Sequence, residues 1–193
     1  MNVLVIPEDF RKDQYILGPI IRAMFSKIGR PANVEVLKDP LLGGVSEALK
    51  IENLRGIFDR NKYYVDLFLL CVDRDLEEGR RASLNNLENQ LRPELPAGKF
   101  FLAENGWQEL EVWVLAGHDL PPDWTWGDIR QERDPKERFF DVMAGNRGLL
   151  NEPGGGRKTL SLEAARRYRR IFSRCGQDIQ NLEGRIVTWI ETL

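Results

Sequence analysis

The chain has 193 residues, of which 42% are hydrophobic and 30% charged, and its net charge is −2. This composition is typical of one soluble globular domain. Two cysteines exclude a disulfide framework, and one histidine excludes a histidine-ligated metal site, so any metal is expected to be a hard cation bound by oxygen. No apolar run approaches the ~20 residues of a membrane span, and the first residues do not resemble a signal peptide. We therefore expect a cytoplasmic protein with no membrane partner.

Strands and helices are predicted to alternate through residues 1–118. The predicted strands span residues 2–6, 33–37, 65–72 and 99–103. The predicted helices span residues 11–27, 45–60, 77–91 and 108–115. This alternation predicts an α/β core with a mainly parallel sheet flanked by helices.

Residues 119–193 are predicted to form a helical C-terminal extension of the same single domain. The predicted helices span residues 135–144, 162–175 and 177–193, with Ser161 as the N-cap of the second. A glycine-rich loop, residues 145–158, lies between the first two. Its GGGRKT segment lacks the spacing of a P-loop, so we expect no nucleotide cofactor there.

The stretch VDLFLLCVDRD, residues 65–75, is the most informative part of the chain. Its unbroken apolar run predicts a strand buried on both faces of the sheet. Asp73 and Asp75 come directly after it. In extended backbone these side chains point the same way, and they would repel unless a cation lay between them. A DxD turn or helix cap accounts for the same residues equally well.

Glu8 follows the first predicted strand. If the first and third strands are neighbours in a parallel sheet, their carboxyl ends lie at the same edge. Glu8, Asp73 and Asp75 would then form an oxygen-only site suited to Mg²⁺ or Mn²⁺, ions that activate phosphoryl groups.

Five short motifs in this order resemble those of the TOPRIM (topoisomerase–primase) fold. They are Pro7-Glu8-Asp9, Asp73-Arg74-Asp75, the segment QELEVW at residues 108–113, Asp134-Pro135-Lys136 and Arg157-Lys158. The chain is most similar to short single-domain TOPRIM-like proteins long catalogued as a domain of unknown function, which are related to OLD-type and defence-associated nucleases. Those proteins usually have Glu-Gly after the first strand, where this chain has Glu8-Asp9.

The resemblance implies a Mg²⁺- or Mn²⁺-dependent nuclease acting on DNA or RNA. Glu8 would be the general acid/base or a metal ligand, and Asp73 and Asp75 would bind the metal. Glu109, slightly preferred over Glu111, would face the site. Lys136 and Lys158 would contact phosphate, although each taken alone is better explained as an ordinary solvated lysine. The resemblance also implies a partner ATPase, for instance in anti-phage defence.

A basic cluster near the C-terminus bears on partners. Arg166, Arg170 and Arg174 are four residues apart and are expected to line one helix face. Like charges on one face need an offsetting partner, which is either a nucleic-acid backbone or acidic side chains. The sequence leaves both interpretations open.

Two other functions are compatible with the sequence. In the first, the fold is a non-catalytic adaptor, and the arginine helix or Trp124 and Trp126 bind a partner such as an ATPase. In the second, the site belongs to a different phosphotransfer enzyme, such as a primase-like polymerase or a nucleotide phosphatase.

Overall fold

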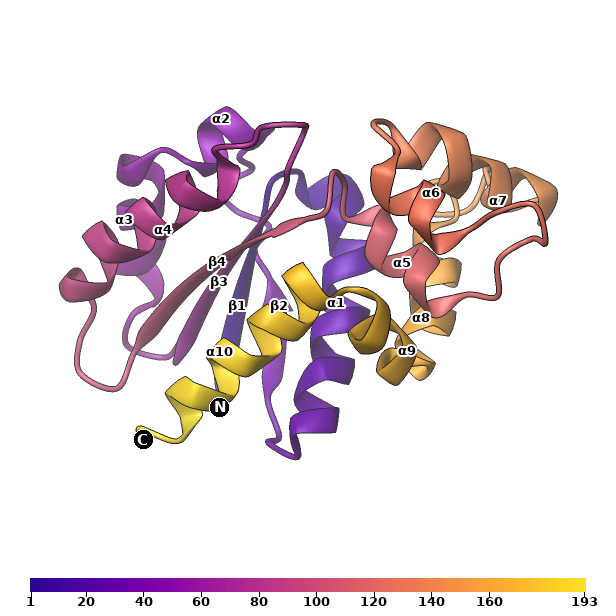
Figure 1. The fold of residues 1–193 in the computed structure, drawn as a ribbon. Coiled ribbons are helices and arrows are strands. Elements are labelled where there is room, and N and C mark those ends of the chain that lie inside the picture. Colours follow the sequence, from indigo (N-terminus) through magenta and orange to yellow (C-terminus); the bar gives the residue numbers. More distant parts are fainter.

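The computed structural model describes all 193 residues as an α/β fold in which helices flank a four-stranded, all-parallel sheet (Figure 1). The strands are β1 (Asn2–Pro7), β2 (Asn33–Val36), β3 (Leu67–Asp73) and β4 (Phe100–Gly106). Their order across the sheet is β2-β1-β3-β4. The predicted α/β class, with its parallel sheet and helical C-terminal part, is confirmed.

The sheet is covered on both faces because its strands are apolar on both faces. Val3 and Val5 of β1 contribute to one hydrophobic cluster, and Leu4 and Ile6 contribute to the other. In β3 every residue from Leu67 to Val72 is buried, which explains the unbroken apolar run. The first face packs against α1 (Phe10–Ile28) and α10 (Asn181–Ile190), and the second against α3 (Ile51–Asn61) and α4 (Arg80–Leu91).

Helix α1 has a well-defined start and end. The side chain of Asp9 accepts a hydrogen bond from the backbone N–H of Arg11, which caps the first turn. Gly29 ends the helix in the left-handed conformation, with φ of 76°. This N-cap holds the first turn of α1 directly after β1, at the edge of the sheet where Glu8 lies.

The C-terminal extension packs beyond α1 and shares its hydrophobic core (Figure 1). It follows α5 (Glu111–Gly117), the last helix of the α/β core. Its elements are α6 (Trp126–Gln131), a π-helical turn η2 (Lys136–Phe140), α7 (Asp141–Asn146), α8 (Arg157–Arg166), α9 (Tyr168–Arg174), a second π-helical turn η3 (Gly176–Gln180) and α10. Gly117 lets α5 approach α8 closely, because a Cβ there would lie 2.6 Å from Ala164. None of the helices combines the length and the apolar character needed to cross a membrane.

Two of the predicted helices are each divided into two α-helices in the structure. The helix predicted over residues 45–60 is two helices, α2 (Val45–Ala48) and α3, because Lys50 adopts extended backbone between them. The helix predicted over residues 162–175 begins earlier, at Arg157, and breaks at Arg167, whose φ and ψ are −109° and 34°.

Two expectations attached to the second helix are therefore wrong. Ser161 is not an N-cap but a buried residue inside α8 whose hydroxyl has no hydrogen-bond partner. Arg166 lies in α8, whereas Arg170 and Arg174 lie in α9, so the three do not line one continuous helix face. The break at Arg167 directs Tyr168 into the core, where its hydroxyl donates to Glu183 at 2.7 Å.

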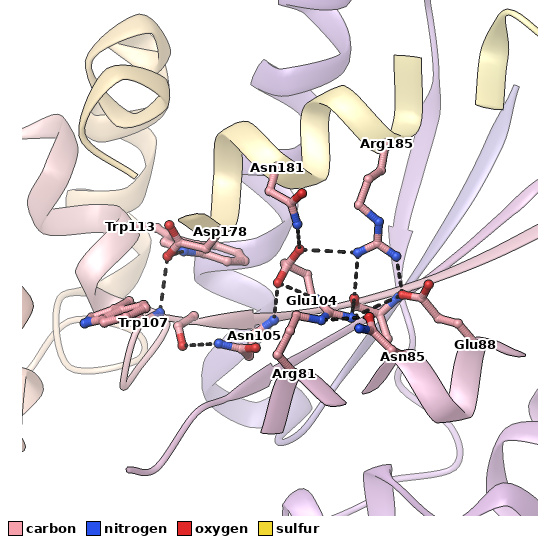
Figure 2. A network of polar contacts seen from close by, with 12 residues as sticks. Arg81, Asn85, Glu88, Glu104, Asn105, Trp107, Trp113, Asp178, Asn181 and Arg185 are labelled. Atoms are coloured by element: carbon pink, nitrogen blue, oxygen red, sulfur yellow. Dashed lines mark hydrogen bonds and ion pairs between the residues drawn. The ribbon is translucent and has the colours of Figure 1, made fainter. Parts of the chain in front are cut away.

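A charge network fastens α4 and α10 to the outer edge of β4 (Figure 2). Two buried carboxylates, Glu88 and Glu104, accept hydrogen bonds from Arg81 and Arg185. The backbone of β4 joins the network, because Ala103 donates its N–H to Glu88 at 2.7 Å and its carbonyl accepts from both arginines. Arg92 donates to the carbonyl of Phe101 at 2.7 Å. The outer edge of the sheet is thus paired with side chains.

Candidate functional site

The direction in which strands are added to the sheet reverses between β1 and β3. From β1 the chain crosses to β2 on one side and then returns to β3 on the other, and β1 and β3 are paired as neighbours from Val3 and Leu67 to Pro7 and Cys71. In open α/β sheets, ligands bind outside the carboxyl ends of the strands at such a reversal. Glu8 directly follows β1, and Asp73 is the last residue of β3.

Glu8 and Asp73 are in contact at this edge. The backbone N–H of Asp73 donates to Oε2 of Glu8 at 3.3 Å. Oδ1 of Asp73 accepts the backbone N–H of Leu110 at 2.8 Å, and Oδ2 has no hydrogen bond. Burial raises the pKa of Glu8, and the nearby charge of Asp75 raises it further, whereas Arg80 lowers it. For Asp73, burial together with Glu111, Glu8 and Asp13 raises the pKa well above its usual value.

Asp13 is a member of the cluster that the sequence did not reveal. It lies in the first turn of α1, where Oδ2 accepts the backbone N–H of Asp9 at 2.8 Å. Burial and the charges of Glu111 and Glu8 raise the pKa of Asp13 to about 7. In sequence it is indistinguishable from the acidic residues that commonly begin helices, so only its position relative to β3 identifies it.

The turn that carries Asp75 has unusual backbone geometry. Asp75 and Leu76 have φ of 51° and 58°, and Gln108, in the loop after β4, has φ of 67°. The carbonyl of Gln108 accepts the N–H groups of Arg74 and Asp75, and its side-chain oxygen accepts that of Leu76. The prediction that Asp73 and Asp75 point the same way assumes extended backbone, and Asp75 does not have it. Its side chain is exposed, at the outer side of the cluster.

Glu109 and Glu111 have different environments. Glu111 begins α5 and is almost completely buried, and Arg157 donates to its Oε1 from both Nε, at 2.9 Å, and Nη2. Glu109 is half-buried, and its Oε2 accepts the backbone N–H of Lys136 at 2.7 Å. Burial, Glu111 and Glu137 raise the pKa of Glu109 to about 7. Glu111 is the member of this pair whose charge acts on Asp73 and Asp13.

Arg157 reaches Glu111 because of the glycine-rich loop. Gly154, Gly155 and Gly156 all have positive φ, between 65° and 87°. At Gly154 a Cβ would lie 2.6 Å from the ring of Tyr15 on α1, so only glycine fits there. The carbonyl of Gly154 also accepts a hydrogen bond from Nη1 of Arg157 at 2.7 Å. The loop therefore places a buried cation beside the carboxylates, a role that the sequence pattern did not indicate.

Four carboxylates thus form what we call the acidic cluster, and Arg157 is the one buried cation among them. The cluster consists of Glu8, Asp13, Asp73 and Glu111. All its donors are oxygen, the ligand type that Mg²⁺ and Mn²⁺ prefer, and a bound cation would relieve the repulsion that raises the pKa of Asp73. The chemistry of the residues therefore fits a hard cation. The structure contains no group of three His, Cys, Asp or Glu side chains already arranged to hold a metal ion.

Of the lysines and arginines predicted to bind phosphate, three are engaged by other parts of the protein and two are exposed without an ion pair. Lys136 forms an ion pair with Glu137. Arg170 pairs with Asp119, and Arg174 donates to the carbonyls of Ala116 and His118 at 3.2 Å each. Arg170 and Arg174 are therefore engaged within the protein, in line with the second of the two interpretations that the sequence left open. Lys158 and Arg166 are exposed on α8 and have no ion pair.

The two tryptophans considered as a docking surface are partly built into the fold. Trp124 packs edge-on against Phe139, with ring centroids 4.9 Å apart. Trp126 donates its indole N–H to the carbonyl of Arg174 at 3.1 Å. Both therefore help to hold the C-terminal helices together.

Comparison of the chain with protein-family models, with curated proteins and with solved structures found no match.

Proposed function

We propose that this chain is a divalent-metal-dependent nuclease of TOPRIM-like type that cleaves phosphodiester bonds of DNA or RNA. The observation that supports it best is the meeting of Glu8 and Asp73, with Asp13 and Glu111 close by, at the reversal point of a parallel sheet. Clusters of mutually repelling carboxylates at such a position are typical of metal-assisted phosphoryl chemistry. A partner ATPase and a role in anti-phage defence belong to this proposal through the sequence resemblance alone.

In this proposal Asp73, Glu8 and Asp13 would hold Mg²⁺ or Mn²⁺, and Asp75 would lie at the solvent side. The cation would supply Lewis-acid polarisation of a phosphoryl oxygen. The protein fixes Asp73 through the N–H of Leu110 and leaves Oδ2 uncommitted. Likewise, Oδ2 of Asp13 is engaged by Asp9, and Oδ1 has no partner.

Thermal melting with and without Mn²⁺ tests the metal site, and cleavage of labelled DNA and RNA oligonucleotides tests the activity. A ligand that binds only the folded state raises its stability, so Mn²⁺ should raise the Tm of the wild type. Asp73→Asn should abolish both this rise and the cleavage. Asp123→Asn, which alters an exposed residue on a distant loop, should leave both unchanged. Wild-type cleavage by Asp73→Asn would refute the proposal.

The absence of a Mn²⁺-dependent rise in Tm in every variant would instead favour the adaptor function. A nucleotide-hydrolysis assay on the same proteins distinguishes a phosphatase, which would release inorganic phosphate from nucleotides and leave oligonucleotides intact.

A further inference from the structure

Arg74 is a cation without an acidic partner, and it lies on the turn that follows β3. It directly follows Asp73, yet its guanidinium forms neither an ion pair nor a side-chain hydrogen bond. Instead the guanidinium carbon lies 4.4 Å from the centroid of the Trp107 ring. A guanidinium carries five N–H donors, and stacking on an aromatic ring engages none of them.

The Trp107 ring is fixed by contacts that do not involve Arg74. The backbone N–H of Trp107 donates to Oδ2 of Asp178 at 3.2 Å (Figure 2). The indole N–H of Trp107 donates to the carbonyl of Arg130 at 2.6 Å. The guanidinium of Arg130 also lies over the ring, at 4.4 Å, and pairs with Asp178 at 3.2 Å. Asp178 thus anchors both the ring and Arg130, so the ring offers Arg74 a rigid support.

The backbone of Arg74 is fixed as well. Its N–H donates to the carbonyl of Gln108 at 2.8 Å, and that of Asp75 donates to the same carbonyl at 3.1 Å. With the backbone and the guanidinium both restrained, Arg74 loses little conformational entropy on binding a ligand.

A second unpaired cation borders the acidic cluster. Arg80 begins α4, and its charge lowers the pKa of Glu8, so the two lie near each other. Its Nε is buried and has no hydrogen-bond partner, and the residue forms no ion pair. Arg80 therefore has unused donors near Glu8, and Arg74 has unused donors on the residue that follows Asp73. An anionic ligand would engage those donors.

We propose that Arg74, held over Trp107, binds a phosphate of the nucleic-acid substrate next to the acidic cluster, with Trp107 acting as its positioning residue. This inference rests on the proposed function and names the group that recognises the substrate. The planar fork of a guanidinium matches two phosphate oxygens, so lysine would replace it only in part.

The test is fluorescence anisotropy of a labelled single-stranded oligonucleotide, DNA and RNA in turn, with Ca²⁺ in place of Mn²⁺ to prevent cleavage. Loss of one charge-assisted phosphate contact should weaken binding about tenfold in Arg74→Ala. It should also reduce the slope of log Kd against log salt concentration by about 0.7. Arg74→Lys should retain the slope and bind with intermediate affinity. Trp107→Leu should weaken binding more than Trp107→Phe, which keeps an aromatic face.

Arg60→Ala is the matched control, because Arg60 is exposed, has no ion pair and lies at the end of α3 that precedes β3, away from the cluster. Its affinity and salt slope should equal those of the wild type. If Arg74→Ala binds with the affinity and salt slope of the wild type, the inference is overturned. The nuclease proposal is tested separately, by Asp73→Asn. If the wild type binds through Arg74 but cleaves nothing with Mn²⁺, the nuclease proposal fails and the phosphate site stands. Failure of the wild type to bind either oligonucleotide overturns the inference.

Discussion

Arg157 donates two N–H groups to a single carboxylate oxygen of Glu111, and both side chains are almost completely buried. The pair joins α8 to α5 and lies next to Asp73 and Asp13, whose pKa values Glu111 raises. The C-terminal extension therefore supplies part of the electrostatic environment of the carboxyl edge of the sheet.

Replacing Arg157 by methionine should destabilise the fold strongly. Glu111 would remain buried without its cation, and removing one partner of a buried ion pair costs about 3–5 kcal/mol. Urea unfolding followed by circular dichroism measures this change. Lys158→Met alters the neighbouring exposed lysine and should change stability by less than about 0.5 kcal/mol. A double variant, Glu111→Leu with Arg157→Met, should regain much of the loss, and equal destabilisation of the single and double variants would contradict this account.

Stability should fall as pH rises through the acidic cluster's titration range. The pKa of Asp13 is about 7 in the folded state against an ordinary value of 3.8, so between these values the folded state binds more protons than the unfolded state. Stability then decreases with increasing pH. Glu104 and Glu109, with pKa values of about 7, contribute in the same window, so the wild-type curve alone does not isolate Asp13.

Asp13→Asn isolates the contribution of Asp13. Urea unfolding from pH 4 to 8 should show the wild type losing about 1–3 kcal/mol relative to the variant, with the change complete near pH 8. Asp123→Asn should run parallel to the wild type. Parallel curves for Asp13→Asn and the wild type would mean that the cluster does not raise the pKa of Asp13.

Two glycines of the glycine-rich loop allow two costs of replacing glycine to be measured separately: the steric clash of a Cβ atom and the strain of left-handed backbone. Gly154 and Gly148 have nearly equal φ, 71° and 69°, but only at Gly154 would a Cβ meet the ring of Tyr15. Gly148→Ala should cost about 1 kcal/mol for its left-handed backbone. Gly154→Ala should cost about 1–3 kcal/mol more, because the ring must move. Equal Tm values for the two variants would show that the loop adapts freely to the methyl group.

Arg185 should contribute to stability through the β4 edge. In Arg185→Met the buried Glu88 and Glu104 each lose one donor but keep Arg81, so we expect a loss of about 1–3 kcal/mol. Hydrogen exchange should accelerate at α10 and at the backbone N–H of Ala103. Arg169→Met removes an exposed arginine without an ion pair and should leave both measurements unchanged. An unaltered exchange rate at Ala103 would show that Arg185 does not hold this edge.

The sequence was sufficient for features that depend on the local pattern. An uninterrupted apolar run indicates a doubly buried strand, and parallel strands align their carboxyl ends, so the proximity of Glu8 and Asp73 followed once β1 and β3 were assumed to be neighbours. Asp13 belongs to the acidic cluster, and Arg157 lies beside it, because of the way in which α1 and α8 pack in the fold. No local sequence pattern encodes that packing. The environments of Glu109 and Glu111 differ for the same reason, since tertiary packing decides which one turns inward.

The side chains along β4 also determine how this protein can meet others. A strand at the edge of a sheet ordinarily offers its backbone to an incoming strand, and this is a common route to aggregation and to peptide capture. Here Glu88 takes the N–H of Ala103, and arginines take the carbonyls of Phe101 and Ala103. At the opposite edge, β2 has only four residues. Enlarging the sheet from another chain at β4 would require breaking this charge network, so protein partners are expected to bind through side-chain surfaces instead.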